Sequence, residues 1–345
     1  MKKVRLGKTN LMVSRIGIGG IPLTRPSERE AIKLIQRAID LGINFIDTAL
    51  GYGDSEIRIG KAIAERREEV ILATKGGWRD KKSALQHIDS SLQRLQTDYI
   101  DLWQFHNIDD FEAYEILLKP GGAMEGAKEA LEAGKIRHIG FSSHSLDVAL
   151  KTVASSHFET VQFPLNFISN EAVDELVPLA KKENVGFIGM KPFAGGNLRD
   201  ANLAIKYVLQ FDNVVPDLGT EKVEEIEEIV NIVNSGSWEL TPQEQQQMEA
   251  LRNELGTQLC QQCGYCMPCP QGVVISLILI ARGMRKLWPE ELFNDPEWWY
   301  PKYEASGKNC IQCGECEEKC PYKLPIREMI SENIEFIEGI IQRKL

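Results

Sequence analysis

The chain has 345 residues, of which 43% are hydrophobic and 26% charged, and it carries a formal net charge of −10. This length exceeds that of one ordinary domain and suits a large barrel with an accessory module. The acidic balance argues against nucleic acids and anionic membrane surfaces as partners. No signal sequence is recognisable behind Met1, and the longest apolar run, Val273 to Ala281, is too short to span a bilayer. We therefore expect a cytoplasmic protein.

Residues 3–14 alternate apolar and polar side chains around a Gly7–Asn10 turn, which predicts a β-hairpin. Strand-like segments then follow at Ile16–Gly19, Ile43–Ile46, Val70–Thr74, Ile100–Phe105, Ile136–Phe141, Thr160–Phe163, Val185–Met190 and Val214–Pro216. Amphipathic segments between them predict helices, including Glu28–Leu41, Ala84–Leu95, Gly126–Ala133, Ala172–Lys182 and Ala201–Leu209. Strand-then-helix units of about 25–30 residues are typical of the α/β class, here a (β/α)8 TIM barrel. A doubly wound open sheet would carry a glycine fingerprint after its first strand, and that spacing is missing.

The cysteines divide the chain, since residues 1–259 contain none and all eight lie between Cys260 and Cys320. Ser235-Gly236-Ser237 is typical of a linker, and Thr241-Pro242 is typical of a helix start. We predict a barrel domain over residues 1–238 and a small α-helical, cysteine-containing domain over residues 239–345. An amphipathic helix from Ile326 to about Ile341 is expected to close the chain.

Three consecutive predicted strands each end in an ionisable side chain. Asp47 follows the second strand, Lys75 ends the third and His106 ends the fourth, while Tyr52 lies in a Gly-flanked turn behind Asp47. Taken singly, such residues are more often helix caps, packed side chains or solvated charges. Because α/β barrels build their active sites at the carboxyl ends of the strands, we expect the four to meet at one rim.

These four residues, in the segments DTALGYGDSE from Asp47 and LATK from Leu72, resemble the aldo-keto reductase superfamily. The similarity covers residues 3–235 and includes the opening VRLGKTNLMVSRIGIG, DLWQFHN from Asp101 and GKIRHIGFS from Gly134. The resemblance implies a (β/α)8 barrel that reduces an aldehyde or ketone. It also implies a nicotinamide cofactor, NADP or NAD, bound across the barrel mouth without a Rossmann unit.

The residue types fit this chemistry. Reduction of a carbonyl group needs a hydride at carbon and a proton at oxygen. A phenol has an ordinary pKa of about 10, and a neighbouring ammonium favours the phenolate, so the proton is easier to give up. We predict that Tyr52 is the general acid, that Lys75 supplies the charge and that Asp47 holds the lysine by an ion pair. His106 is expected to donate a hydrogen bond to the carbonyl oxygen.

The resemblance also implies which residues hold the cofactor. Ser142 and Gln162 match positions that bind the carboxamide, and Met190 stands where many relatives place a Tyr against the nicotinamide. Near the adenosine phosphate the segment after the eighth strand is rich in Glu, with Lys222 as its only cation, which weakens the expectation of NADP preference. The implied set is Gly19, Ser142, Ser143, Gln162, Met190, Lys191, Pro192, Phe193, Gly195, Gly219, Thr220, Lys222, Glu225 and Glu228.

The cysteines form two runs, each closed by Cys-Pro. The first is Cys260, Cys263, Cys266 and Cys269, and the second is Cys310, Cys313, Cys316 and Cys320. The second spacing matches the bacterial ferredoxin pattern, in which the fourth cysteine of each run serves the other cluster. We therefore predict two [4Fe-4S] clusters, one on Cys260, Cys263, Cys266 and Cys320, the other on Cys310, Cys313, Cys316 and Cys269. Zinc, and a single-cluster version, are the alternatives.

A barrel followed by a ferredoxin-like tail resembles the ferredoxin-domain aldo-keto reductases. The clusters are then either redox-active, exchanging electrons with a ferredoxin or another carrier, or structural. An aromatic group between the two runs either packs the small domain against the barrel or narrows the substrate pocket; its members are Trp288, Phe293, Trp298, Trp299, Tyr300 and Tyr303. The leading hypothesis is a reductase of small carbonyl compounds. Its rivals are an electron-transfer protein with the barrel as docking module, and a regulatory subunit that binds nucleotide.

Overall fold

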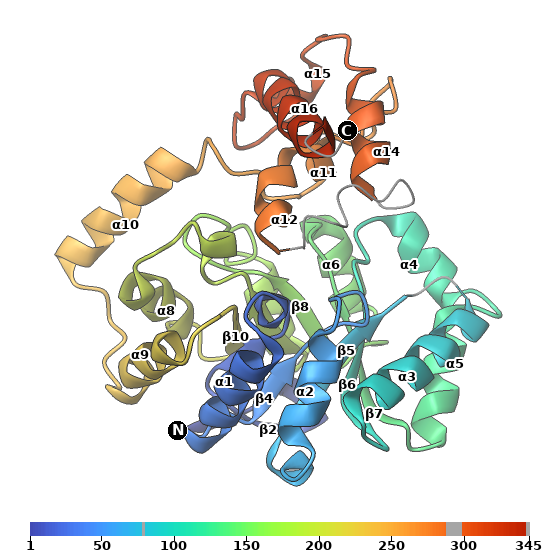
Figure 1. Cartoon of the computed structure of the whole chain (residues 1–345), viewed down its shortest axis with the longest axis vertical. Helices are drawn as coiled ribbons and strands as arrows, with labels where there is room; N and C mark the ends of the chain where they lie inside the picture. The colour runs from blue at the N-terminus through green and yellow to red at the C-terminus, as the bar shows by residue number, and fades with distance from the viewer. Residues whose placement is uncertain (78–79, 288–298, 343–345) are drawn as a thin grey trace. The chain divides into compact units, whose positions relative to one another are not determined.

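The computed structural model shown in Figure 1 describes residues 1–77, 80–287 and 299–342. It comprises two compact units, Met1–Gln245 and Gln246–Leu345, and we describe each by itself. Within the described ranges, none of the helices is long and apolar enough to cross a membrane. Three members of the aromatic group, Trp288, Phe293 and Trp298, lie outside the described residues.

The first unit is a closed barrel of eight parallel strands, as the alternating pattern predicts. In barrel order the strands are β10 (Val214–Leu218), β3 (Gly17–Gly19), β4 (Phe45–Asp47), β5 (Ile71–Gly76), β6 (Ile100–Phe105), β7 (Ile136–Ser142), β8 (Thr160–Pro164) and β9 (Gly186–Met190). All eight strand segments expected from the sequence are present, with ends that differ by one or a few residues. The barrel closes where Asp217 on β10 pairs with Gly17 on β3.

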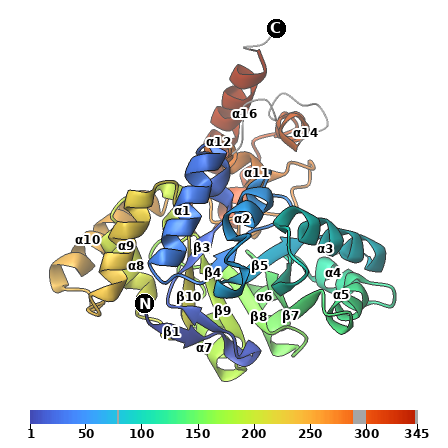
Figure 2. The ribbon, with the colours of Figure 1, turned by 60° about the horizontal axis from the view of Figure 1, so that its bottom comes forward.

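Helices surround the barrel (Figures 1 and 2). They are α1 (Glu28–Asp40), α2 (Ser55–Ile63), α3 (Lys81–Leu95), α4 (Phe111–Leu118), α5 (Ala123–Glu132), α6 (Leu146–Ala154), α7 (Leu176–Lys182), α8 (Ala201–Leu209) and α9 (Val223–Asn234). Local sequence fixes their starts: the Ser27 hydroxyl accepts from the Glu30 amide and the Glu30 carboxylate accepts from the Ser27 amide, forming a capping box at α1. The connection from β6 to β7 holds two helices, α4 and α5, where the sequence pattern indicates one.

An antiparallel hairpin of β1 (Lys3–Arg5) and β2 (Met12–Ser14) precedes the barrel, as predicted. Figure 2 shows it at the end where the barrel strands begin. Leu6 and Val13 from this hairpin belong to one buried cluster with the inward side chains Phe45, Ala73, Leu102, Ile188 and Val215. The amino end of the barrel is thus filled with apolar side chains, which leaves polar groups to the carboxyl end.

The strand register brings those polar groups into one layer. Asp47 pairs with Ala73, and Lys75, two residues further on, pairs with Gln104. On the other side of the barrel, Ser142 pairs with Gln162. Because alternate residues of a strand point to the same face, these side chains enter the barrel near its carboxyl end.

The second unit is helical. It contains α11 (Ile275–Leu279), α12 (Ala281–Leu287), α14 (Trp299–Gly307), α15 (Glu315–Glu318) and α16 (Ile326–Gln342). Its buried core comprises Val273, Ile275, Ile278, Leu279, Leu324, Ile326 and Ile330. The apolar run that begins at Val273 therefore fills the interior of this unit, and Tyr303 packs against the same core.

Helix α10 (Pro242–Leu255) crosses from the first unit to the second. Its first turn is tied to α8, because the Glu244 carboxylate accepts hydrogen bonds from Asn202 Nδ2 (2.7 Å) and Lys206 Nζ (2.8 Å). The sequence-based division after residue 238 stays a prediction.

Candidate active site and cysteine centre

The four predicted catalytic residues come together at the carboxyl end of the barrel strands. Asp47 is the last residue of β4, Lys75 lies near the end of β5 and His106 follows β6 directly. Tyr52 lies in the turn between β4 and α2, where its amide donates to the Ala49 carbonyl oxygen (3.0 Å) and its own carbonyl oxygen accepts from the Ser55 amide (2.9 Å). Consecutive barrel strands thus deliver side chains from distant parts of the sequence to one place.

Lys75 and Asp47 form a buried ion pair, with side chains each only 2% exposed. The Lys75 ammonium also donates to the Thr48 carbonyl oxygen at 2.7 Å. An unpaired charge at this depth would be costly, so the burial of each charge depends on its partner. The carboxylate therefore fixes the position of the ammonium, as the sequence predicts.

Tyr52 lies against both Lys75 and His106. The Lys75 Nζ atom is 5.2 Å from the centre of the Tyr52 ring. The Tyr52 and His106 rings meet edge to face, with centroids 5.6 Å apart and planes at 77°. The phenol ring of Tyr52 thus contacts both an ammonium and an imidazole, two groups of the kinds that can polarise a carbonyl oxygen.

The protonation states follow from burial and charge. Burial, followed by the charge of Lys75, lowers the pKa of His106 to about 3, so its imidazole is neutral. Burial lowers the pKa of Lys75, but Asp47, Tyr52 and Asp217 together outweigh this effect, and the net pKa is raised. For Tyr52, burial raises the pKa more than Lys75 lowers it. The expected effect of the ammonium on the phenol is therefore present, but it is an offset against burial and does not make the phenol a strong acid.

Two polar side chains beneath the ion pair were not singled out from the sequence. The Gln104 Nε2 atom donates to Asp47 Oδ1 at 3.1 Å, and Asp217 Oδ2 accepts from Gln162 Nε2 at 3.0 Å. A signal was available, because Gln104 and Asp217 are polar residues inside otherwise apolar strands. Such residues in a buried strand point to a polar network.

Gln162 belongs to the same network. Its Nε2 atom also donates to Asp47 Oδ2 (3.1 Å), and its Oε1 atom accepts from Gln104 Nε2 (3.3 Å). Both ends of this amide are thus engaged inside the barrel, and Oε1 keeps a second lone pair that can accept a further hydrogen bond. The neighbouring Ser142 hydroxyl oxygen accepts from the Asn107 amide at 2.9 Å.

A second group of polar residues lies at the ends of β7 and β9. Lys191 Nζ contacts His144 Nε2 at 2.9 Å, and His144 Nδ1 lies 3.5 Å from Asp109 Oδ2. The Ser143 hydroxyl donates to Asp109 as well (3.2 Å). His144 was missed from the sequence because its partners are 35 and 47 residues away in the chain.

The residues implied for the pyrophosphate and adenosine ends of a nucleotide lie after β9 and β10. Pro192, Phe193 and Gly195 follow Lys191, and Gly195 adopts a left-handed backbone (φ 67°) in a 3-10 turn, η4 (Ala194–Gly196). Such a conformation suits glycine and lets a ligand approach the backbone closely.

At the start of α9, the Glu225 carboxylate accepts from the Glu221 amide (2.8 Å) and the Lys222 amide (3.2 Å). Lys222 is the only cation in this segment of the chain, and the fold adds a second one, because Arg25, after the 3-10 turn η2 (Ile21–Thr24), forms an ion pair with Glu221. The remaining implied residues lie nearby in the chain, with Gly219 exposed, Thr220 buried and Glu228 exposed.

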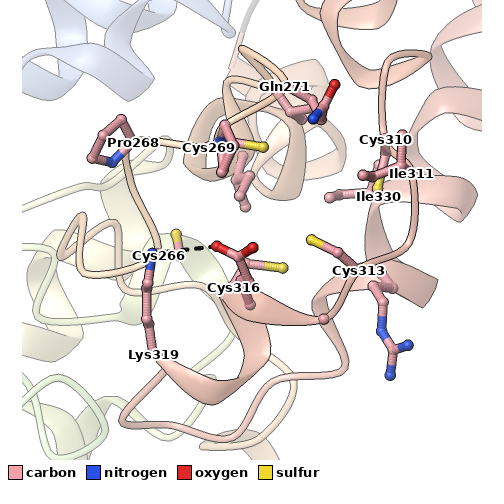
Figure 3. Close-up of a pocket in the computed structure, with 16 residues that line it drawn as sticks. Cys266, Pro268, Cys269, Gln271, Cys310, Ile311, Cys313, Cys316, Lys319 and Ile330 are labelled. Carbon is pink, nitrogen blue, oxygen red and sulfur yellow. Dashed lines mark ion pairs between the residues drawn. The ribbon is translucent and has the colours of Figure 1, made fainter.

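In the second unit, the two cysteine runs converge on one cavity. Five thiols line it: Cys266, Cys269, Cys310, Cys313 and Cys316. Figure 3 shows sulfur atoms from both runs around a common space. The eight cysteines, all of which lie in the described ranges, form no disulfide bonds, and Cys313 is exposed. The shared cavity is the arrangement expected when the fourth cysteine of one run serves the cluster of the other.

The other thiols extend this arrangement. Cys260, Cys266 and Cys320 pack against the buried core of this unit. Burial, followed by the negative charges of Cys260 and Cys263, raises the pKa of Cys266 to about 12. The Gln262 amide donates to the Cys260 sulfur at 3.4 Å, a contact that stabilises a thiolate ligand. Within residues 1–77, 80–287 and 299–342, no three His, Cys, Asp or Glu side chains converge closely enough to hold a single metal ion.

Known proteins resemble both units. The aldo/keto reductase family profile matches residues 15–240, and the 4Fe-4S dicluster domain profile matches residues 259–324. Aldo-keto reductase YhdN from Bacillus subtilis is 36% identical over 204 residues, which are 54% of this chain and 60% of YhdN. L-galactose dehydrogenase from Arabidopsis thaliana is 33% identical over 214 residues, which are 56% of this chain and 66% of the relative. The chain therefore spans less than two thirds of the length of these relatives.

Solved structures agree with the sequence matches. The holo form of aldo-keto reductase AKR11C1 from Bacillus halodurans superimposes with a TM-score of 0.62 at 28% identity, over 73% of this chain and 96% of that one. PA4992 from Pseudomonas aeruginosa superimposes with a TM-score of 0.60 at 25% identity, over 68% of this chain and 94% of that one. The family profile covers most of the barrel unit, including all four residues at its rim. This chain belongs to the aldo/keto reductase family and carries a C-terminal 4Fe-4S dicluster domain.

Proposed function

We propose that the barrel is an NAD(P)H-dependent oxidoreductase that reduces an aldehyde or ketone, with Tyr52 as the proton donor. The observation that carries this proposal is the contact of Tyr52 with the Lys75 ammonium on one side and the His106 ring on the other. When bound, the reduced nicotinamide supplies the hydride to the carbonyl carbon. The remaining task is proton delivery at the carbonyl oxygen, and Tyr52 is the group placed to perform it.

Each neighbour of Tyr52 has a distinct role in this scheme. Lys75, held by Asp47, stabilises the phenolate that forms when the phenol proton leaves. His106 is neutral and can donate a hydrogen bond to the carbonyl oxygen without adding a charge to the pocket. The cofactor would be held by the residues that follow β7, β9 and β10, with the left-handed Gly195 turn and the start of α9 beside its phosphates.

Replacement of Tyr52 by Phe tests this role. We expect the variant to bind NADPH or NADH as the wild type does, and to reduce 4-nitrobenzaldehyde at least about 100-fold more slowly, because a general acid contributes about that much. Steady-state assays without air would measure the rate of aldehyde reduction and the KM for each cofactor. An unchanged rate of aldehyde reduction in Tyr52→Phe would exclude the mechanism.

We also propose that the second unit binds two [4Fe-4S] clusters, one on Cys260, Cys263, Cys266 and Cys320, the other on Cys269, Cys310, Cys313 and Cys316. Support comes from the cavity that cysteines of both runs line. Four zinc ligands would converge around one ion at about 2.3 Å, whereas a cubane keeps its cysteines further apart.

Iron and acid-labile sulfide, measured without air, should each approach about eight atoms per chain. Zinc in place of iron would contradict the assignment. Iron near four would support the single-cluster alternative.

A role in electron transfer is the second candidate function, and the exposure of Cys313 favours it. Its neighbour Ile311 is 64% exposed, so one edge of this cluster would face solvent, where an external one-electron carrier such as a ferredoxin could approach. Reduction of the clusters by a ferredoxin, detected as bleaching of their visible absorbance, would support this role. Clusters that no carrier and no reduced nicotinamide can reduce would indicate a structural function. Because cluster thiolates need a reducing compartment, we infer a cytoplasmic location.

A further inference from the structure

The barrel contains a second carboxyl group beside Asp47, and the mechanism above makes no use of it. Asp217 lies on β10 and its side chain enters the polar layer of the barrel, where Oδ2 accepts a hydrogen bond from Gln162 Nε2 at 3.0 Å. The same nitrogen donates to Asp47 Oδ2 at 3.1 Å. A single amide group therefore bridges two carboxyl groups.

The other oxygen of Asp217 indicates a bound proton. Oδ1 is buried and has no hydrogen-bond donor among the described residues. It faces Gly19, since a Cβ atom at that position would lie only 3.0 Å away. A buried oxygen without a donor is costly as a carboxylate, whereas a protonated carboxyl can itself donate. Asp47 is the neighbouring acceptor, since Gln162 Nε2 lies 3.1 Å from Asp47 Oδ2 and 3.0 Å from Asp217 Oδ2.

The surrounding charges favour the same state. The titratable groups near Asp217 are Asp47 from β4, Tyr52 from the turn after β4, and Lys75 from β5. Lys75 is already engaged by Asp47 and by the Thr48 carbonyl oxygen. A second carboxylate would leave the cavity with one uncompensated negative charge. Burial, then the charge of Asp47, raises the pKa of Asp217 well above its usual range, and Lys75 only partly offsets them.

Resting on the proposed role of Tyr52, we propose that Asp217 is a positioning residue for the proton transfer. It stays protonated at neutral pH, donates a hydrogen bond to Asp47 and keeps the Asp47–Lys75 pair electrically balanced beneath Tyr52. When Tyr52 gives its proton to the carbonyl oxygen, one negative charge appears at the phenol. An ionised Asp217 would add a second, which would hold the phenol proton more tightly. The Asp217 proton itself does not leave during the reaction.

Infrared spectroscopy tests the protonation state directly. The full chain, with its clusters and with aspartate carboxyl carbons labelled with ¹³C, should show an isotope-sensitive carboxylic-acid band at pH 7. We expect that band to vanish at alkaline pH and to be missing from Asp217→Asn. The wild-type spectra suffice even where the variant fails to fold. A wild-type protein without a protonated aspartate at pH 7 would overturn the proposal.

A phenol titration tests the effect on Tyr52. The ultraviolet absorbance of phenolate is followed against pH in each protein and in the same protein with Tyr52→Phe added. The difference between the two spectra isolates the signal of Tyr52 and cancels the absorbance of the clusters. We expect Tyr52 to titrate about one pH unit or more lower in Asp217→Asn than in the wild type, because wild-type Asp217 has lost its proton at the alkaline pH where Tyr52 titrates, and the variant lacks that negative charge. An identical titration in both backgrounds would overturn the proposal.

The matched control is Asp212→Asn, which makes the same chemical change just before β10. The Asp212 side chain is 75% exposed and pairs with Lys181. It should leave the Tyr52 titration where it is. Neither measurement involves carbonyl reduction, so failure of this proposal is distinguishable from failure of the proposed function, which the Tyr52→Phe assay tests.

Discussion

The two candidate centres of this chain are assembled in opposite ways. In the barrel, Asp47, Lys75, His106 and Gln162 come from four strands or strand ends and meet only because the sheet closes. In the second unit, each run brings four cysteines within about a dozen residues, and only the pairing between runs depends on the fold. The barrel site is therefore a product of long-range register, and the cysteine centre is largely a product of local spacing.

Their stability differs in the same way. The barrel site already contains its counter-charges, since Lys75 and Asp47 neutralise each other in the interior. The cysteine centre contains thiols around a cavity, and these lose their protons and become charged ligands when metal binds. The comparison leads to the four predictions that follow, from the largest effect to the smallest.

Lys75→Met should produce the largest loss, because it leaves Asp47 as an uncompensated buried charge. We expect the free energy of unfolding to fall by about 3–5 kcal/mol, and the rate of carbonyl reduction to fall by at least about 100-fold. Chemical unfolding and steady-state kinetics measure the two effects. The matched double variant, Lys75→Met with Asp47→Asn, removes both charges and should recover most of the stability but none of the activity. Full stability in the single variant would show that the ion pair is not buried as described.

Removal of iron should affect the two units unequally. Chelation under reducing conditions is expected to melt the helices around the cysteines, because metal binding and folding are coupled in such small domains. The barrel should retain its fold and its affinity for nicotinamide. Far-ultraviolet circular dichroism and cofactor fluorescence would follow the two units separately. Loss of cofactor binding together with loss of iron would contradict this independence.

Cys313→Ser, which removes one ligand of one cluster, should give a loss of helix content between those of the wild type and the iron-free protein.

The pH dependence of stability should carry a contribution from His106. The folded-state pKa is about 3, against an ordinary value of 6.5, so the unfolded chain binds the proton more readily. Stability therefore decreases as the pH falls from about 6.5 toward 3, and this part of the decrease should be absent in His106→Asn. Unfolding by urea at several pH values measures the slope. Equal slopes in both proteins would mean that His106 is not held neutral by its surroundings.

Glu221→Gln should have the smallest effect, a change in cofactor preference. Glu221 engages Arg25 beside the start of α9, where the sequence resemblance places the adenosine phosphate. Loss of its charge frees Arg25 for a 2′-phosphate, so the KM for NADPH should fall by a few fold relative to that for NADH. The control is Glu227→Gln on α9, which releases Arg37 of α1. If both variants change the ratio equally, the Arg25 pair has no specific role.

Much of this structure could be predicted from the sequence. The strands alternate with amphipathic helices at regular distances, so all eight strands and the rim positions of Asp47, Lys75 and His106 follow from local patterns. The role of the cysteine runs is still easier to predict from the sequence, because ligand spacing in a cluster site is a local property.

The polar layer inside the barrel could not be predicted with the same ease. Gln104, Asp217 and His144 find their partners across the barrel, and no local pattern states which strands face each other. Arg25 was missed for the same reason, since 196 residues separate it from Glu221. The net pKa of Tyr52 was also beyond the sequence, because it depends on how deeply the closed barrel buries the ring.

The most direct test of the central claim is a double-mutant cycle between Tyr52 and Lys75. If both side chains act on one proton transfer, Tyr52→Phe combined with Lys75→Met should reduce aldehydes about as slowly as Tyr52→Phe alone, because the lysine has no phenol to act on. Single-turnover oxidation of bound NADPH by 4-nitrobenzaldehyde would measure all four proteins of the cycle. Losses that multiply in the double variant would show that the two residues act independently, and would contradict this account of the site.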